Sequence, residues 1–538
     1  MTAAAADRSL DNGCVAIVRP AVPDAVAAHP DASPGAAAAD GRTAPVARDD
    51  ARRAVTLLLA AAILLGVGLR LKHYFARHAY WHDEASLVLN IFEKNAKQLL
   101  GPLDLAQAAA PGFLLLERGV YVLLGRSELA MRLPPLLASL AGIAIFSWLA
   151  WRLLASGNER GGSRIALLVI VLWSCAERLI WHAAEAKQYS IDVLVALTLL
   201  AVALREDRNE TARLVTCAAI AAVAVWFSHA TAFVFGGVSL ALLPAMIRSQ
   251  RGRGMVTWMA ANALFGVSFL ALYFASVRNQ QVNALYEYWA AGFVDFSKPW
   301  IIPVWMFRGM MGIANYALDL GGPVLLPLAA LGAYVLWVHG RRQVLGVLVM
   351  PAVLVLVASA IRQYPFNGSR LTLFLTPNVF LLAGVGVVAL IEWTGGHPKW
   401  KWLAVAVPGY LLAVAAWWAI VYLVRPPIYG NMPAAVRYVA AHDAPQDVIY
   451  ANKISEFRCY WPDAQQHQLR DAKELDTHVP DGRFWLVLSY RKEKAIEEFV
   501  DDASRQAQQL DAFKVTGGAA MLFDGTNGPS SRPSAFAN

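Results

Sequence analysis

The sequence predicts an all-α polytopic membrane protein followed by a small α/β domain at its C-terminal end. Of its 538 residues, 57% are hydrophobic and only 16% are charged, whereas soluble proteins carry about a quarter charged residues. Apolar runs of about 20 residues, the length that crosses a bilayer, recur between residues 55 and 424. Because irregular backbone in lipid would leave amides unsatisfied, these runs must be helices. After residue 425 the chain turns polar, and short strand-like and helix-like segments alternate.

Residues 1–50 are expected to form a disordered cytoplasmic tail. They are rich in Ala, Asp and Pro and show no apolar periodicity, which is typical of disorder. No charged segment leads into an apolar one, so a cleaved signal peptide is not expected. Arg52 and Arg53 directly precede the first apolar run and predict a cytoplasmic N-terminus.

Eleven apolar runs are expected to cross the membrane, within a transmembrane domain spanning residues 51–424. They lie at about 55–71, 133–151, 165–181, 190–204, 212–228, 231–247, 255–277, 321–338, 344–361, 371–391 and 403–424. Residues 72–132 form the first periplasmic loop. Within it, residues 111–125 are apolar but short and are interrupted by Glu117 and Arg118, which favours a helix lying in the interface.

The positive charges support this topology and argue against a nucleic-acid partner. The net charge is +8, but the basic residues sit in short clusters between apolar runs. With eleven crossings these clusters all face one side, as cytoplasmic loops do. They are Arg152/Arg160/Arg164, Arg205/Arg208/Arg213, Arg248/Arg251/Arg253, Arg341/Arg342 and Lys399/Lys401.

An odd number of crossings places residues 425–538 outside, as a periplasmic α/β domain. Helices are expected at 431–442 and 492–510, and strands at 447–451, 483–489 and 519–523. Alternation of this kind is typical of a small α/β fold.

The outer face collects the polar residues that are unusual for a membrane protein. Asp83 and Glu84 open the first outer loop, and an acid at the membrane edge is costly and provides no anchoring, which favours a functional role. Other candidates are expected at the same face: His82, Glu185, Lys187, Tyr189, His229, Arg362, Tyr364 and Arg370. Each cation has an alternative role as an interface anchor, and the histidines have one in packing.

These groups are suited to sugar transfer from a lipid phosphate. Arg binds a phosphate with two parallel hydrogen bonds, and a nearby carboxylate can remove a proton from an acceptor hydroxyl or amine. Phosphate is a good leaving group, so the second carboxylic acid that a glycoside hydrolase uses is not required.

The order of motifs resembles the GT-C superfamily of polytopic glycosyltransferases, and more narrowly the family-39 relatives of protein O-mannosyltransferases and the aminoarabinose lipid A transferase. The matching stretches, within about residues 55–450, are "DE" after the first span, "APGFLLLERGVYVLLGRSELAMRLPPLLASLAG", "AAEAKQYSIDVLVAL" and "SHATAFVF".

This resemblance implies roles for particular residues. Asp83, with Glu84 beside it, matches the acidic motif that activates or orients the acceptor. Lys187 stands where the family's "E-A-R-P-Y" carries Arg, so a cation is kept without the bidentate fork. Arg362 and Arg370 fall near the late outer loop that contacts the lipid phosphate. Ala109 and Ala110 stand where the aminoarabinose transferase has a Lys before its proline, which argues against assuming the same donor sugar.

The resemblance also implies an inverting glycosyltransferase of the bacterial inner membrane with a polyprenyl-phosphate sugar donor. The acceptor is an envelope molecule: lipid A or core oligosaccharide, another glycan, or a protein. With one acidic pair and no clear third ligand, no obligatory metal or cofactor is expected.

Two other functions remain open at this point. A lipid-linked sugar flippase or transporter would show polar residues at mid-membrane depth and broken helices, whereas here the runs are mostly apolar through their middles. The other open function is a membrane scaffold whose C-terminal domain binds a partner.

Overall fold

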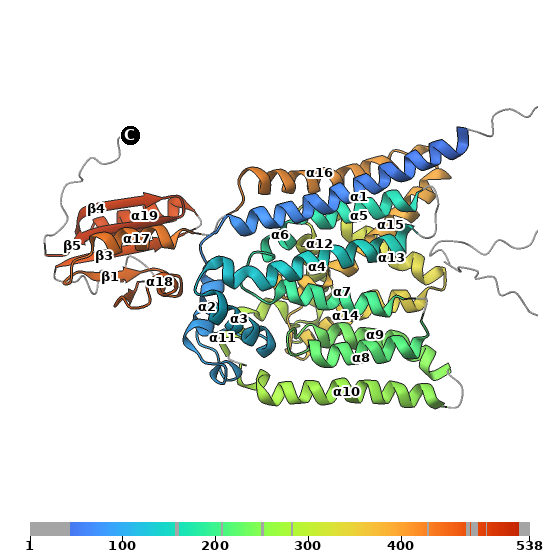
Figure 1. Cartoon of the computed structure of the whole chain (residues 1–538), viewed down its shortest axis with the longest axis horizontal. Coiled ribbons are helices and arrows are strands. Elements are labelled where there is room, and N and C mark those ends of the chain that lie inside the picture. The colour runs from blue at the N-terminus through green and yellow to red at the C-terminus, as the bar shows by residue number, and fades with distance from the viewer. Residues whose placement is uncertain are drawn as a thin grey trace, which may run out of the picture.

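The computed structural model describes residues 43–155, 161–205, 208–248, 252–280, 283–427, 430–469, 474, 482–490 and 492–526. It shows a bundle of long helices with a separate sheet domain beyond one end (Figure 1). Most of the expected tail lies outside the described residues, although the first helix already begins at Thr43.

Each of the eleven expected spans corresponds to a helix, which confirms the predicted polytopic all-α architecture. The eleven helices are α1 (Thr43–Phe75), α4 (Glu128–Ala155), α5 (Gly162–Cys175), α7 (Tyr189–Ala203), α8 (Glu210–Ala224), α9 (Thr231–Arg248), α10 (Arg253–Ala275), α13 (Gly322–Val338), α14 (Arg342–Ala360), α15 (Thr376–Gly395) and α16 (Leu403–Val424). Seven spans in the described chain are long and apolar enough to cross a membrane singly. Helices α5, α7 and α8 are shorter, with 14, 15 and 15 residues.

The outer surface of the bundle is apolar, as a lipid-facing surface must be. Helix α10 lies at the edge of the bundle (Figure 1) and exposes Val256, Val267, Leu270 and Phe274. In water such a surface would be unstable, but lipid tails are as apolar as these side chains. The protein therefore crosses the membrane several times.

One apolar helix was not expected from the sequence. Helix α12 (Ile302–Ala317) lies between the expected spans 255–277 and 321–338, and it joins α13 at a bend of 107°. Its 16 residues are too few to cross a bilayer straight at 1.5 Å per residue. Together α12 and α13 form a broken span.

Helices α13 and α15 approach each other through glycines. A Cβ at Gly332 would lie 2.0 Å from the backbone oxygen of Leu382, and one at Gly386 would lie 2.0 Å from that of Leu328. Small residues at such contacts let two membrane helices pack backbone to backbone. This packing fixes α15, whose N-terminal extension η6 (Arg370–Leu375) carries one of the candidate site residues.

The short elements of the first loop lie at the end of the bundle that faces the sheet domain (Figure 1). They are α2 (His82–Glu93), η1 (Gln98–Leu100) and α3 (Pro111–Leu124). Helix α3 has 14 residues and Pro111 at its first position, where the missing amide hydrogen costs nothing. Helix α6 (Glu177–His182), α11 (Asn283–Tyr288), η3 (Val277–Asn279), η4 (Ala290–Gly292), η5 (Pro299–Ile301) and η7 (Pro398–Trp400) complete the set.

Residues 432–524 form a five-stranded sheet with three helices. The strands are β1 (Val448–Ala451), β2 (His467–Gln468), β3 (Arg483–Ser489), β4 (Gln508–Val515) and β5 (Gly518–Asp524), in the order β2-β1-β3-β5-β4. β1 is parallel to β2 and β3, and β5 is antiparallel to β3 and β4. The small α/β domain is therefore confirmed, but residues 508–510, expected at the end of a helix, begin β4 instead.

Helices α17 (Met432–His442), α18 (Ile454–Tyr460) and α19 (Glu493–Ser504) cover the sheet, and α18 joins it to the bundle. The Ser455 hydroxyl lies 3.0 Å from His82 Nδ1, and the Tyr460 hydroxyl accepts a 2.8 Å hydrogen bond from the Tyr80 amide. Cys459 packs into the same apolar cluster as the buried face of α2. The sheet domain thus contacts the helix that begins with the sequence His82-Asp83-Glu84.

Candidate active site

A cavity of about 220 Å³ opens beside the start of α2. Its walls come from segments far apart in the sequence: the first loop, the start of α7, the turn between α8 and α9, and the segments around residues 285 and 364. Three oppositely charged side chains that the sequence singled out line it, namely the acid Asp83 and the cations Lys187 and Arg370. The fold therefore brings together an acid and two cations that are up to 287 positions apart in the chain.

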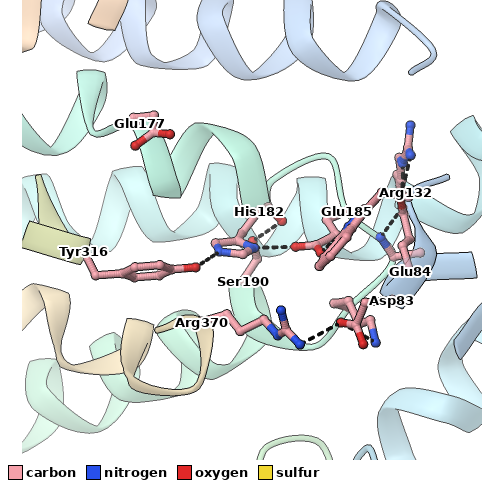
Figure 2. Close-up of polar contacts among 12 residues, drawn as sticks. Asp83, Glu84, Arg132, Glu177, His182, Glu185, Ser190, Tyr316 and Arg370 are labelled. Carbon is pink, nitrogen blue, oxygen red and sulfur yellow. Dashed lines mark hydrogen bonds and ion pairs between the residues drawn. The ribbon is translucent and has the colours of Figure 1, made fainter. Parts of the chain in front are cut away.

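Asp83 binds both cations through one carboxylate oxygen. Lys187 Nζ lies 3.1 Å from Asp83 Oδ2, and an Arg370 guanidinium nitrogen lies 3.3 Å from the same atom. Figure 2 shows Arg370 and Asp83 directed toward each other. Gln107 closes the group, since its amide nitrogen donates to Asp83 Oδ1 at 3.3 Å and its oxygen accepts from Lys187 Nζ at 2.7 Å.

Burial and the neighbouring charges together determine the pKa values of Asp83 and Lys187. Burial acts to raise the pKa of Asp83, but Lys187 and Arg370 outweigh it and hold the pKa below its ordinary value. Burial also lowers the pKa of Lys187, against the opposing effect of Asp83. The carboxylate is therefore ionised at neutral pH and able to accept a proton.

Strained backbone in the first loop places Gln107. The two residues before it, Leu105 and Ala106, have φ of 59° and 51°, in the left-handed region that is costly for residues other than glycine. Gln280 holds the following turn, because its side-chain oxygen accepts a 2.9 Å hydrogen bond from the Ala109 amide. Strain of this kind persists where the surrounding structure enforces it, and it is common at functional sites.

Aromatic rings surround the Arg370 guanidinium. Its central carbon lies 5.5 Å from the ring centre of Trp81, 5.3 Å from that of Trp289 and 6.0 Å from that of Tyr288. Rings at these distances attract a cation through their electron-rich faces. They also hold the guanidinium in place at the cavity wall.

Glu84 does not line the cavity, although it was expected to act with Asp83. It is buried, with 1% of its surface exposed, and forms a two-pronged pair with Arg132 at 2.8 and 2.7 Å. It also accepts a 2.8 Å hydrogen bond from the Ala186 amide, next to Lys187. Glu84 therefore ties α2, α4 and the segment before α7 together, and positions Asp83 relative to Lys187 (Figure 2).

Behind the cavity lies a hydrogen-bonded row that includes Glu185. Its carboxylate contacts His182 Nδ1 and accepts a 2.8 Å hydrogen bond from the Trp81 indole, while His182 Nε2 lies 2.8 Å from the Tyr316 hydroxyl. Figure 2 shows this row beside the Asp83–Arg370 pair. Glu185 thus supports Trp81, which in turn packs on Arg370, and does not itself line the cavity.

The remaining expected residues divide into two groups. Tyr189, His229 and Tyr364 line the cavity. His82 is exposed toward the sheet domain, where it contacts Ser455. Arg362 was expected at the lipid phosphate, but its side chain is exposed and does not line the cavity, because the chain turns away there with a φ of 56°.

No family model matches the chain, and no curated protein does. Among solved structures, it is similar to ArnT from Cupriavidus metallidurans in the apo state, with 14% identity over 88% of this chain and 98% of that chain and a TM-score of 0.48. The same protein bound to undecaprenyl phosphate matches with 14% identity over 87% of this chain and 97% of that chain, at a TM-score of 0.45. ArnT belongs to the GT-C superfamily, the one that the order of motifs resembles. At this identity and TM-score, the likeness assigns no role to any residue here.

Gln107, Asp192 and Trp289 are among the cavity residues that were not predicted from the sequence. Asp192 carried a signal, because it is an acid within the apolar run 190–204 and such residues default to function. Gln107 and Trp289 carried no such signal, because nothing in the sequence around them indicates that their loops turn toward the cavity. Among the described residues no group of three or more His, Cys, Asp or Glu side chains is placed to hold a metal ion.

Proposed function

We propose that this protein is an inverting glycosyltransferase. It transfers a sugar from a polyprenyl-phosphate-linked donor to a lipid, glycan or protein acceptor at the periplasmic face of the bacterial inner membrane. The observation that carries the proposal is the ionised Asp83 carboxylate held between Lys187 and Arg370 in the wall of a cavity at one end of the membrane helices.

The charges of the site suit a phosphodiester. Asp83, Lys187 and Arg370 together carry a formal charge of one positive unit, and a sugar phosphodiester carries one negative unit. A donor phosphate bound between the cations would therefore neutralise the group. Charge-assisted bonds from Lys and Arg to phosphate oxygens are the strong class of hydrogen bond, and the buried setting strengthens them further.

Donor binding also prepares the base. As the phosphate takes over hydrogen bonds from Lys187 and Arg370, Asp83 loses the two contacts that depress its pKa, so the carboxylate becomes a better proton acceptor. It then removes the proton from an acceptor hydroxyl or amine as that group attacks the anomeric carbon. The bond between that carbon and the phosphate oxygen breaks, and the configuration inverts in this single displacement.

The cations stabilise the leaving group. Cleavage leaves polyprenyl phosphate with one more negative charge than the donor phosphate had, and this charge develops next to Lys187 and Arg370. Fixed cations aimed at developing charge lower a barrier without reorganising. For this reason no second acid is needed to protonate the departing oxygen.

The basic clusters support a periplasmic orientation of the site. Helices α4, α7, α9 and α15 end, and α5, α8, α10 and α16 begin, at the end of the bundle away from the sheet domain (Figure 1). These are the ends that carry the Arg and Lys clusters. Positive loops stay in the cytoplasm, so the cavity and the sheet domain would face the periplasm.

The broken span favours one alternative, a lipid-linked sugar flippase. Transporters bind substrate at broken helices, and α12 and α13 meet at a bend of 107°. A flippase moves the intact lipid-linked sugar across the bilayer and forms no glycosylated product. The two functions therefore differ in their product, because only the transferase forms a glycosylated molecule.

Mass spectrometry of envelope glycolipids and glycoproteins tests the proposal. A strain lacking this protein should lose one glycan mass difference, and the intact chain should restore it. The purified protein in proteoliposomes should transfer the sugar from the lipid donor to an acceptor extract of the deletion strain. Movement of the lipid-linked sugar across the vesicle membrane, with no glycosylated product, would contradict a transferase and favour the flippase.

A further inference from the structure

A second polar region of the same cavity surrounds Asp192. This residue lies on α7, three positions after Tyr189, which places it roughly 4.5 Å further along the helix axis. It lines the cavity with 6% of its surface exposed. Its Oδ1 atom has no hydrogen-bond partner among the residues that the structure describes.

His229 faces the same cavity from the turn between α8 and α9. Its Nε2 atom is buried and likewise lacks a partner within the described part of the chain. Burial lowers the pKa of His229 to about 4, so the imidazole is neutral at physiological pH. A neutral ring nitrogen can donate or accept a hydrogen bond.

Two further hydroxyls lie at this region. The Ser228 hydroxyl, next to His229 in the sequence, is buried and its oxygen also has no hydrogen-bond partner among the described residues. Tyr364 lines the cavity and donates its hydroxyl hydrogen to the Leu371 carbonyl at 2.7 Å. The Tyr364 oxygen remains able to accept a hydrogen bond from a ligand.

This arrangement has no evident structural purpose. Buried carboxylates in folded proteins are normally paired or fully hydrogen-bonded, because an unsatisfied one is costly. Glu84 shows the usual solution in this protein, with Arg132 and a backbone amide satisfying it. Asp192 and His229 instead present unsatisfied atoms to a cavity, next to the cations that suit a phosphate.

We infer that Asp192 and His229 form the subsite that holds the sugar ring of the lipid donor. This inference rests on the proposed function. The carboxylate accepts hydrogen bonds from sugar hydroxyl or amino groups, and the imidazole bonds a neighbouring one. The donor phosphate then lies at Lys187 and Arg370. The sugar lies about one helical turn away from the phosphate, at Asp192 and His229. Asp83 lies between the anomeric carbon and the acceptor. Recognition of the sugar and recognition of the phosphate are thus separate.

The test compares two probes on the purified full-length protein in nanodiscs. One is undecaprenyl phosphate. The other is the best-bound member of a panel of undecaprenyl-phosphate sugars carrying glucose, mannose, galactose, arabinose or an amino sugar. Asp192→Asn and His229→Phe should each weaken binding of the sugar-bearing lipid about tenfold or more, with undecaprenyl phosphate unchanged. Arg370→Gln should weaken both probes.

Several results would overturn this inference. A wild-type protein that binds no panel member more tightly than undecaprenyl phosphate has no sugar subsite. Equal losses for both probes in the Asp192→Asn and His229→Phe variants would show a structural role, and unchanged affinity for both would show no role. Thermal unfolding of each variant identifies misfolding, and Asp192→Glu, which keeps the charge, should recover part of the preference. Failure of the wild type to bind either lipid would instead reject the proposed function.

Discussion

Asp83→Asn should lower kcat for sugar transfer by about 10²–10⁴-fold, the usual contribution of a general base. The amide keeps the size of the side chain but cannot accept the acceptor's proton. Lys187 and Arg370 lose their counter-ion in this variant, so they remain available to the donor phosphate. Donor affinity should therefore stay the same or increase while turnover is lost. Transfer rates and donor Kd, measured on the same purified sample, separate the two effects.

Two neighbouring acids serve as controls for Asp83→Asn. Asp104 lies in the same loop, is largely exposed and pairs with Lys94, so Asp104→Asn should leave transfer unchanged. Glu84→Gln should instead destabilise the fold by about 3–5 kcal/mol, because it leaves the buried Arg132 charge uncompensated. Full transfer activity in Asp83→Asn would show that the base lies elsewhere. A parallel loss of folding in Asp83→Asn would assign it a structural role.

Arg370→Gln should weaken donor binding by about 10–150-fold, the value of one charge-assisted hydrogen bond. The change removes the guanidinium, so Trp81 and Trp289 lose the group on which they pack. Affinity for undecaprenyl phosphate should fall, and the KM for the acceptor should change much less. Titration of the lipid into purified protein measures the first quantity, and steady-state kinetics measures the second.

Arg362→Gln is the matched control for Arg370→Gln. Arg362 lies in the same late loop, but its side chain is exposed and outside the cavity. We expect the Arg362→Gln variant to bind the donor like the wild type. If Arg362→Gln and Arg370→Gln weaken the donor equally, the assignment of the phosphate to Arg370 is wrong and the loop acts through its overall charge.

The membrane architecture was predictable because its signal is local. A bilayer imposes a length of about 20 apolar residues on each crossing helix, and each such run is visible without knowledge of its neighbours. Helix α12 was missed because its 16 residues, which include Arg308, fall short of that length. Only the tertiary structure shows that it joins α13 in one broken span. In the sheet domain, β4 was missed for a different reason, because residues 508–510 continue a helix-like pattern.

The site was predictable in its composition but not in its geometry. The sequence identified Asp83 and Glu84 as a pair, yet successive residues on a helix point about 100° apart. Once α2 begins at His82, only one of the two acids can face the cavity. Lys187 and Arg370 were found as isolated cations, but their meeting at one carboxylate oxygen depends on packing across 183 positions of sequence.

The proposed reaction requires the cavity to face the periplasm, and cysteine accessibility tests this orientation most directly. The described cysteines, Cys175, Cys217 and Cys459, are buried, so the labelling background is low once Cys14 is replaced by Ser. Asp104 and Lys399 are exposed and lie on opposite sides in the predicted topology. In cells with a permeabilised outer membrane, a membrane-impermeant maleimide should label Asp104→Cys at once and Lys399→Cys only after lysis. Labelling of Lys399→Cys before lysis, with Asp104→Cys protected until lysis, would place the cavity in the cytoplasm and contradict the proposed reaction.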